Sequence, residues 1–134
     1  MRVPPLLGVT TAVIVLGACG APQARQEEAA RAGRFFEESL AAGDFRAACA
    51  LLAPESREQL AEGEEKPCAE ALAGQDLPRG GGVRSVDVYG RQALLGLRGD
   101  TLFLSEFDEG WRVVAAGCVA EPGDTPYHCV LKGA

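Results

Sequence analysis

The chain has 134 residues, which is the size of one domain. Its 19 acidic residues outnumber its 13 basic residues and give a formal net charge of −6 without a basic stripe, which argues against nucleic acid as a partner. Five cysteines and one histidine, with no CxxC motif, argue against a zinc site and against a redox-catalytic cysteine pair.

The N-terminus has the pattern of a secretory signal. Arg2 supplies a positive charge, and residues 3–16 are mostly apolar, uncharged and too few for a membrane span of about 20 residues. The run ends in LGAC, residues 16–19, which resembles the lipobox of bacterial lipoproteins: an aliphatic residue, two small residues and a cysteine. This resemblance implies that Cys19 accepts a diacylglyceryl group and becomes the mature N-terminus after cleavage.

We therefore expect three parts. Residues 1–18 are predicted to be a lipoprotein signal peptide, residues 19–26 a lipidated Cys19 with a short tether, and residues 27–134 one domain at the extracytoplasmic face of the cell membrane. An ordinary signal peptide is the alternative. Two acyl chains anchor a protein stably, whereas one chain does not. Because the acidic domain is not attracted to anionic lipid, the lipid anchor alone would hold the chain on the membrane.

Helical signals fill the first half of the domain. Four helices are predicted, over residues 26–42, 45–53, 55–62 and 67–74. Apolar residues recur at helical spacing in the first helix, and Gly43 ends it. Asp44 is predicted to cap the second helix by accepting backbone N–H bonds, while Pro54 and Pro67 open the third and fourth.

From residue 79 onward, short strands and turns replace the helical pattern. Four strands are predicted, over residues 83–90, 91–99, 101–107 and 111–118, followed by a loop and a short apolar end at residues 127–131. Gly80-Gly81-Gly82 lacks the strand and helix that flank a phosphate-binding loop and is predicted to be a flexible joint. Helices followed by an antiparallel meander define an α+β fold, with the helices packed on one face of a curved sheet.

The four cysteines other than Cys19 indicate two disulfides, because an even number in an exported domain is typical of a disulfide framework. Four cysteines allow three pairings. We favour the sequential pairing, Cys49 with Cys68 and Cys118 with Cys129, because it joins two neighbouring helices and ties the last predicted strand to the tail.

Three segments resemble known families. Residues 35–54, with the order helix, Ala-Gly-Asp, helix, Leu-Leu-x-Pro, resemble the opening of the NTF2-like (cystatin-like, cone-shaped) α+β fold, and GWRV at 110–113 resembles the start of its last strand. AGC at 116–118 with PYHC at 126–129 resembles the ending of small lipoproteins of high-GC Gram-positive bacteria. The resemblance covers about residues 27–131 and implies a concave pocket between helices and sheet.

No acid–base pair for catalysis is evident. His128 stands beside a disulfide cysteine, Asp87 lies between two valines and is expected to point outward, and Asp44 is a helix cap. Candidates for lining an apolar pocket are Phe103, Phe107 and Trp111, which are also candidates for the core.

Two functions from different classes remain. The first is a non-catalytic binding or accessory module for an envelope protein or a small apolar ligand, with no cofactor and no metal. The alternative is a small isomerase or dehydratase-type enzyme that uses the cone pocket. The binding module is favoured, and a polar pair of side chains inside the pocket would favour the enzyme instead.

Overall fold

The computed structural model describes residues 1–5, 8, 12, 21–123 and 126–133. Within these residues, four helices precede a five-stranded antiparallel sheet, so the α+β class is as predicted and the sheet has one strand more than the four expected. The helices are α1 (Ala21–Ala41), α2 (Phe45–Ala50), α3 (Pro54–Glu64) and α4 (Cys68–Ala73). The strands are β1 (Val83–Tyr89), β2 (Gln92–Leu97), β3 (Thr101–Phe107), β4 (Gly110–Val119) and β5 (His128–Leu131).

The sheet is a meander in which each strand pairs with the next along the chain. The additional strand, β5, is the segment expected to be only an apolar tail. It pairs with β4 so that Cys129 lies opposite Cys118, and Cys129 and Leu131 are buried while His128 and Val130 are exposed. The segment is a strand because it pairs with β4 and is bonded to it by the disulfide, and its own four residues would not have predicted this.

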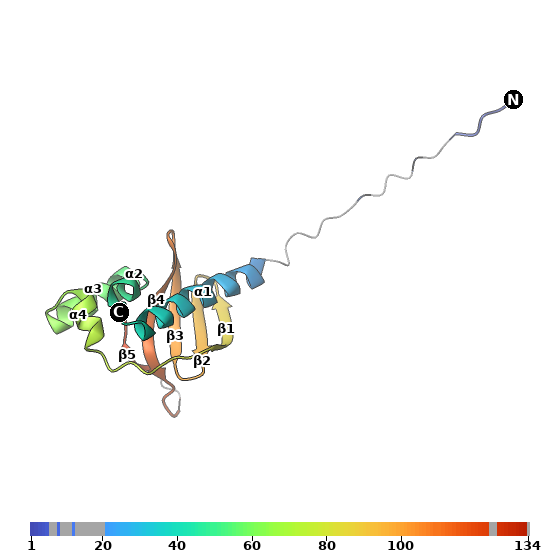
Figure 1. Cartoon of the computed structure of the whole chain (residues 1–134). Helices are drawn as coiled ribbons and strands as arrows, with labels where there is room; N and C mark the ends of the chain where they lie inside the picture. Colours follow the sequence, from blue (N-terminus) through green and yellow to red (C-terminus); the bar gives the residue numbers. More distant parts are fainter. Residues whose placement is uncertain (6–7, 9–11, 13–20, 124–125, 134) are drawn as a thin grey trace.

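Helix α1 lies across one face of the sheet and contacts β1 to β4 (Figure 1). It presents Ala29 and Phe36 to a core that contains Leu95 and Leu102, all without exposed surface. Gly33 lets the helix come close, because a Cβ atom there would lie 2.1 Å from Leu95 Cδ2. Close packing of one face of a single helix on the sheet therefore builds most of the core.

Helices α2, α3 and α4 gather at the β4–β5 side of the sheet (Figure 1). The segment between α2 and α3 runs beside β4, where Ala53 N–H donates to Val113 O and Val113 N–H donates to Leu51 O, each at 2.8 Å. Asp44 caps α2 as predicted, since its Oδ1 accepts from Ala47 N–H at 3.1 Å. The segment between α2 and α3 thus pairs with part of the β4 edge that β5 leaves open.

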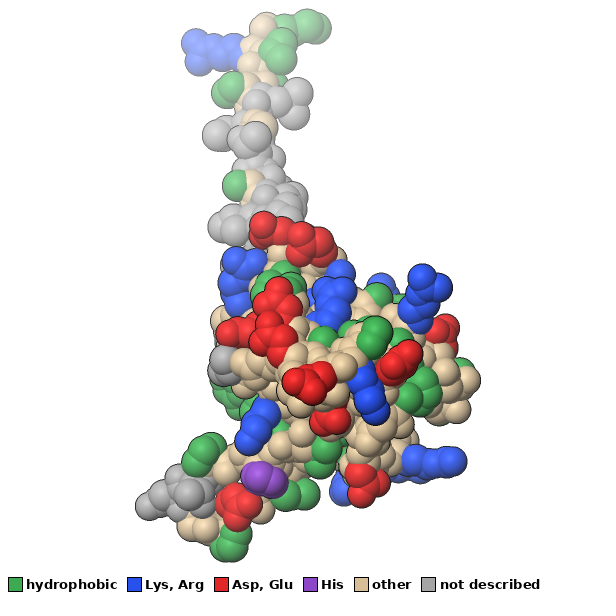
Figure 2. Space-filling view, turned by 90° about the vertical axis from the view of Figure 1, so that its left-hand side faces the viewer, with side chains coloured by type: hydrophobic (Ala, Val, Ile, Leu, Met, Phe, Trp, Pro, Cys, Tyr) green, Lys and Arg blue, Asp and Glu red, His purple; other side chains and the backbone are tan. Residues whose placement is uncertain are grey.

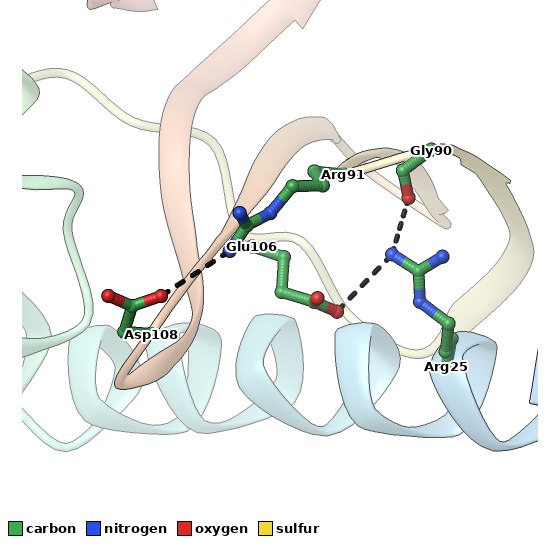
Figure 3. A network of polar contacts seen from close by, with 5 residues as sticks. All are labelled: Arg25, Gly90, Arg91, Glu106 and Asp108. Carbon is green, nitrogen blue, oxygen red and sulfur yellow. Dashed lines mark hydrogen bonds and ion pairs between the residues drawn. The ribbon is translucent and has the colours of Figure 1, made fainter.

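The start of α1 differs from the prediction, because the helix begins at Ala21 and residues 21–25 are helical rather than an extended tether. Arg25 holds this first part of the helix on the sheet (Figure 3). Its guanidinium donates to the Gly90 carbonyl, pairs with Glu106 at 3.3 Å and lies 5.6 Å from the ring centroid of Trp111. The residues expected to form a linker are thus part of the domain.

Cys19 and most of the predicted signal peptide lie outside the described residues. Among the helices of the part that is described, none combines the length and the apolar character needed to cross a membrane. On the face that carries α3 and α4, acidic and basic side chains are interspersed (Figure 2).

Candidate functional site

A pocket of about 490 Å³ lies between the C-terminal half of α1, helices α2 and α4, and the segment 75–81 that leads to β1. Its apolar wall includes Leu40, Phe45, Leu72, Leu77 and Pro78. Its polar groups come from Glu37, Glu38, Gln75 and Arg79. An apolar wall with a few polar groups is typical of sites that bind small molecules.

Glu37 is the unusual group in this wall. Its Oε2 accepts a hydrogen bond from Gly80 N–H at 3.1 Å, whereas its Oε1 is buried and has no hydrogen-bond partner within the described part of the chain. Burial raises the pKa of Glu37 from 4.5 to about 7; the Gly80 N–H lowers this pKa in part and the nearby Asp100 carboxylate raises it. Near neutral pH the side chain is therefore poised between its neutral and its ionised form.

Gly80 brings the backbone donor to Glu37. A Cβ atom at this position would lie 2.5 Å from Glu37 Cδ and 2.5 Å from Leu97 Cδ1, so the approach requires glycine. Gly99 N–H donates to Gly80 O at 2.8 Å and holds the segment against the β2–β3 turn. The glycine run expected to be a flexible joint is instead fixed at Gly80, which is buried and forms part of the site.

Asp100 influences Glu37 without lining the pocket. Its carboxylate accepts backbone N–H bonds from Thr101 at 2.7 Å, Gly117 at 2.9 Å and Cys118 at 3.1 Å. Burial raises the pKa of Asp100, and these three bonds lower it in part. We assign Asp100 a structural role, tying the β2–β3 turn to β4, with an electrostatic effect on Glu37.

The disulfides form in the predicted pairing. Cys49 is bonded to Cys68, which joins α2 to α4, and Cys118 is bonded to Cys129. The other residues considered for catalysis stand apart: Asp87 and His128 are exposed on β1 and β5.

The three aromatic candidates for pocket lining do not come together, and none of them lines the pocket beside Glu37. Trp111 is 4% exposed and belongs to the core face of the sheet. Phe103 and Phe107 alternate with the core residues of β3 and lie on its other face, where Phe103 meets the ring of Tyr127 at 5.2 Å. Strand alternation therefore separates these side chains, and the pocket is built from helices.

The sequence did contain a signal for Glu37. It directly follows Phe36 and precedes Leu40 by three positions, which places an acidic residue beside the apolar stripe of the helix. Gly80 gave no comparable signal, because its role depends on a contact with a residue 43 positions away.

Within the described ranges, no cluster of three or more histidine, cysteine or acidic side chains is placed to hold a metal ion. Comparisons with models of known protein families, with curated proteins and with solved structures find no match.

Proposed function

We propose that this chain is a lipid-anchored, extracytoplasmic protein with an NTF2-like domain whose pocket beside Glu37 binds a small, largely apolar ligand. The lipobox-like LGAC at residues 16–19 supports the anchor and the location. A helix laid across an antiparallel meander supports the NTF2-like assignment. The observation that carries the binding function is the pocket itself, with its apolar wall and one half-buried carboxyl group.

A small molecule fits this site better than a protein partner does. The site is concave and of a size that suits a small ligand, and its polar groups are few: Glu37, Glu38, Gln75 and Arg79. Such an arrangement buries the apolar part of a ligand against Leu40, Phe45 and Leu72 and orients its polar end toward the side of Glu37.

The binding function is tested by native mass spectrometry of the protein purified from its own membranes. We expect a bound small molecule. Ala73→Phe should exclude it, because Ala73 lines the pocket, whereas Ala50→Phe should retain it. The two alanines are matched, since each is exposed and ends a short helix. A wild-type protein without ligand, or a ligand that survives Ala73→Phe, would contradict the proposal.

The anchor is tested separately. Cys19→Ala should release the protein from the membrane fraction and remove the added mass of the diacylglyceryl group. Unchanged membrane retention of this variant would show that Cys19 is not the anchor.

One observation favours an enzyme as the second candidate. A carboxyl group whose pKa lies at about 7 is suited to proton transfer at neutral pH, as in isomerases and dehydratases. Wild-type protein incubated with the identified ligand should then convert it, and Glu37→Gln should bind it unchanged. A ligand that both proteins return unaltered excludes this candidate.

A further inference from the structure

We propose that the end of the domain formed by the first turns of α1, the β1–β2 turn and the β3–β4 turn rests on the membrane surface, so that the pocket opens away from the membrane. This orientation rests on the lipid anchor proposed above. It follows from where α1 begins and from what Arg25 contacts.

The connection between the proposed anchor and the domain is short. Only Gly20 separates Cys19 from Ala21, the first residue of α1. Two residues span roughly 7 Å even when fully extended. A diacylglyceryl group on Cys19 would therefore hold the N-terminal end of α1 at the level of the lipid headgroups.

The contacts of Arg25 show which part of the sheet lies beside the N-terminal end of α1. Its guanidinium contacts the Gly90 carbonyl in the β1–β2 turn and Glu106 near the end of β3 (Figure 3). Alternate turns of an antiparallel meander lie at the same end of the sheet, so the β3–β4 turn at residues 108–109 lies at this end too. The N-terminal end of α1 and both turns consequently face the bilayer together.

The side chains at this end suit contact with headgroups. Tyr89 is 65% exposed at the end of β1, and a tyrosine ring with its hydroxyl group is well suited to a membrane interface. Arg91 and Asp108 form an exposed ion pair at 3.8 Å, and Glu109 is exposed beside them. The charges are mixed, so contact does not depend on anionic lipid and the anchor supplies the attachment.

The pocket lies toward the other end of the helix. Glu37 follows Arg25 by 12 positions, which is about 18 Å along an α-helix. Residues of α2, α4 and the segment 75–81 line the rest of the pocket, and none of its lining residues belongs to the membrane-facing turns. A ligand would therefore enter from the aqueous space of the envelope rather than directly from the bilayer.

The single tryptophan permits a direct test, because Trp111 lies near the proposed membrane-facing end. The lipidated full chain is placed on phosphatidylcholine vesicles that carry a nitroxide on the headgroup. We expect loss of Trp111 emission. In the matched variant Trp111→Phe with Phe45→Trp, the only tryptophan lines the pocket, and we expect its emission to be retained.

Hydrogen exchange of the unmodified sequence provides a second measurement that needs no substitution in the domain. Relative to Cys19→Ala, the lipidated protein on vesicles should exchange more slowly at residues 22–25 and 89–91, and at an unchanged rate at residues 75–81. Equal quenching at both tryptophan positions, or slowed exchange confined to 75–81, would overturn the orientation. Lipidated protein that does not float with vesicles would instead refute the anchor itself.

Discussion

Replacing Glu37 with glutamine should remove a pH-dependent loss of stability. The folded protein holds the Glu37 proton more tightly than the unfolded chain does, because burial raises its pKa from 4.5 to about 7. The resulting stabilisation is complete below about pH 4.5 and is lost as the pH rises through about 7. At about 1.4 kcal/mol for each pKa unit, the loss is at most about 3.5 kcal/mol. Partial exposure of the side chain reduces this to about 1–2 kcal/mol.

Glutamine keeps an acceptor for Gly80 N–H and carries no charge. Glu37→Gln should therefore gain stability relative to the wild type as the pH rises from about 5 to about 8, measured by urea unfolding with the disulfides intact. The raised pKa of Asp100 makes stability fall with rising pH in both proteins. The test is therefore the difference in unfolding free energy between wild type and Glu37→Gln at each pH. Glu38→Gln is the matched control, because it removes one negative charge from an exposed neighbour in the same pocket wall. Parallel pH profiles for wild type and Glu37→Gln would refute the reasoning.

Two further predictions concern the attachments that hold the domain together. Arg25→Ala should lower stability by about 1–2 kcal/mol and shift the Trp111 emission to the red, because it removes an ion pair and a cation–π contact. Arg34→Ala, on the same helix and exposed, should change neither. Replacing Cys49 and Cys68 together with alanine should lower stability by about 3 kcal/mol, because the bridge closes a loop between residues 19 positions apart, and an unchanged urea midpoint would contradict this.

The element order was predictable because its signals are local. Apolar spacing and the Asp44 cap identify the first two helices, and turn residues separate the first four strands. The two differences depend on partners outside the segments themselves. The start of α1 is stabilised by a contact between Arg25 and Gly90, 65 positions apart, and β5 is a strand because β4 and a disulfide lie beside it. No local window around the start of α1 contains Gly90, whereas Cys118 lies only 11 positions before Cys129, so the predicted disulfide already indicated a partner for β5.

The disulfide pairing was predictable from the same local order, but the pocket was not. Aromatic residues on strands suggested a site on the sheet, and strand alternation places Phe103 and Trp111 on opposite faces. The pocket instead forms where the segment 75–81 packs against α1, and its key hydrogen bond joins Gly80 to Glu37. The perturbed pKa arises from that packing and so has no counterpart in the sequence.

The cost of Glu37 to the fold is itself an argument for a role in binding. A glutamine would accept the same bond from Gly80 N–H and would carry no charge near Asp100. Either side chain leaves the atom at the Oε1 position without a hydrogen-bond partner among the described residues, but only the carboxyl group can ionise there, and its ionised form destabilises the fold. Folding alone therefore favours glutamine at this position. Glu37 lines the pocket although it lowers stability. Its presence is explained if the ligand binds to the carboxyl group or exchanges a proton with it.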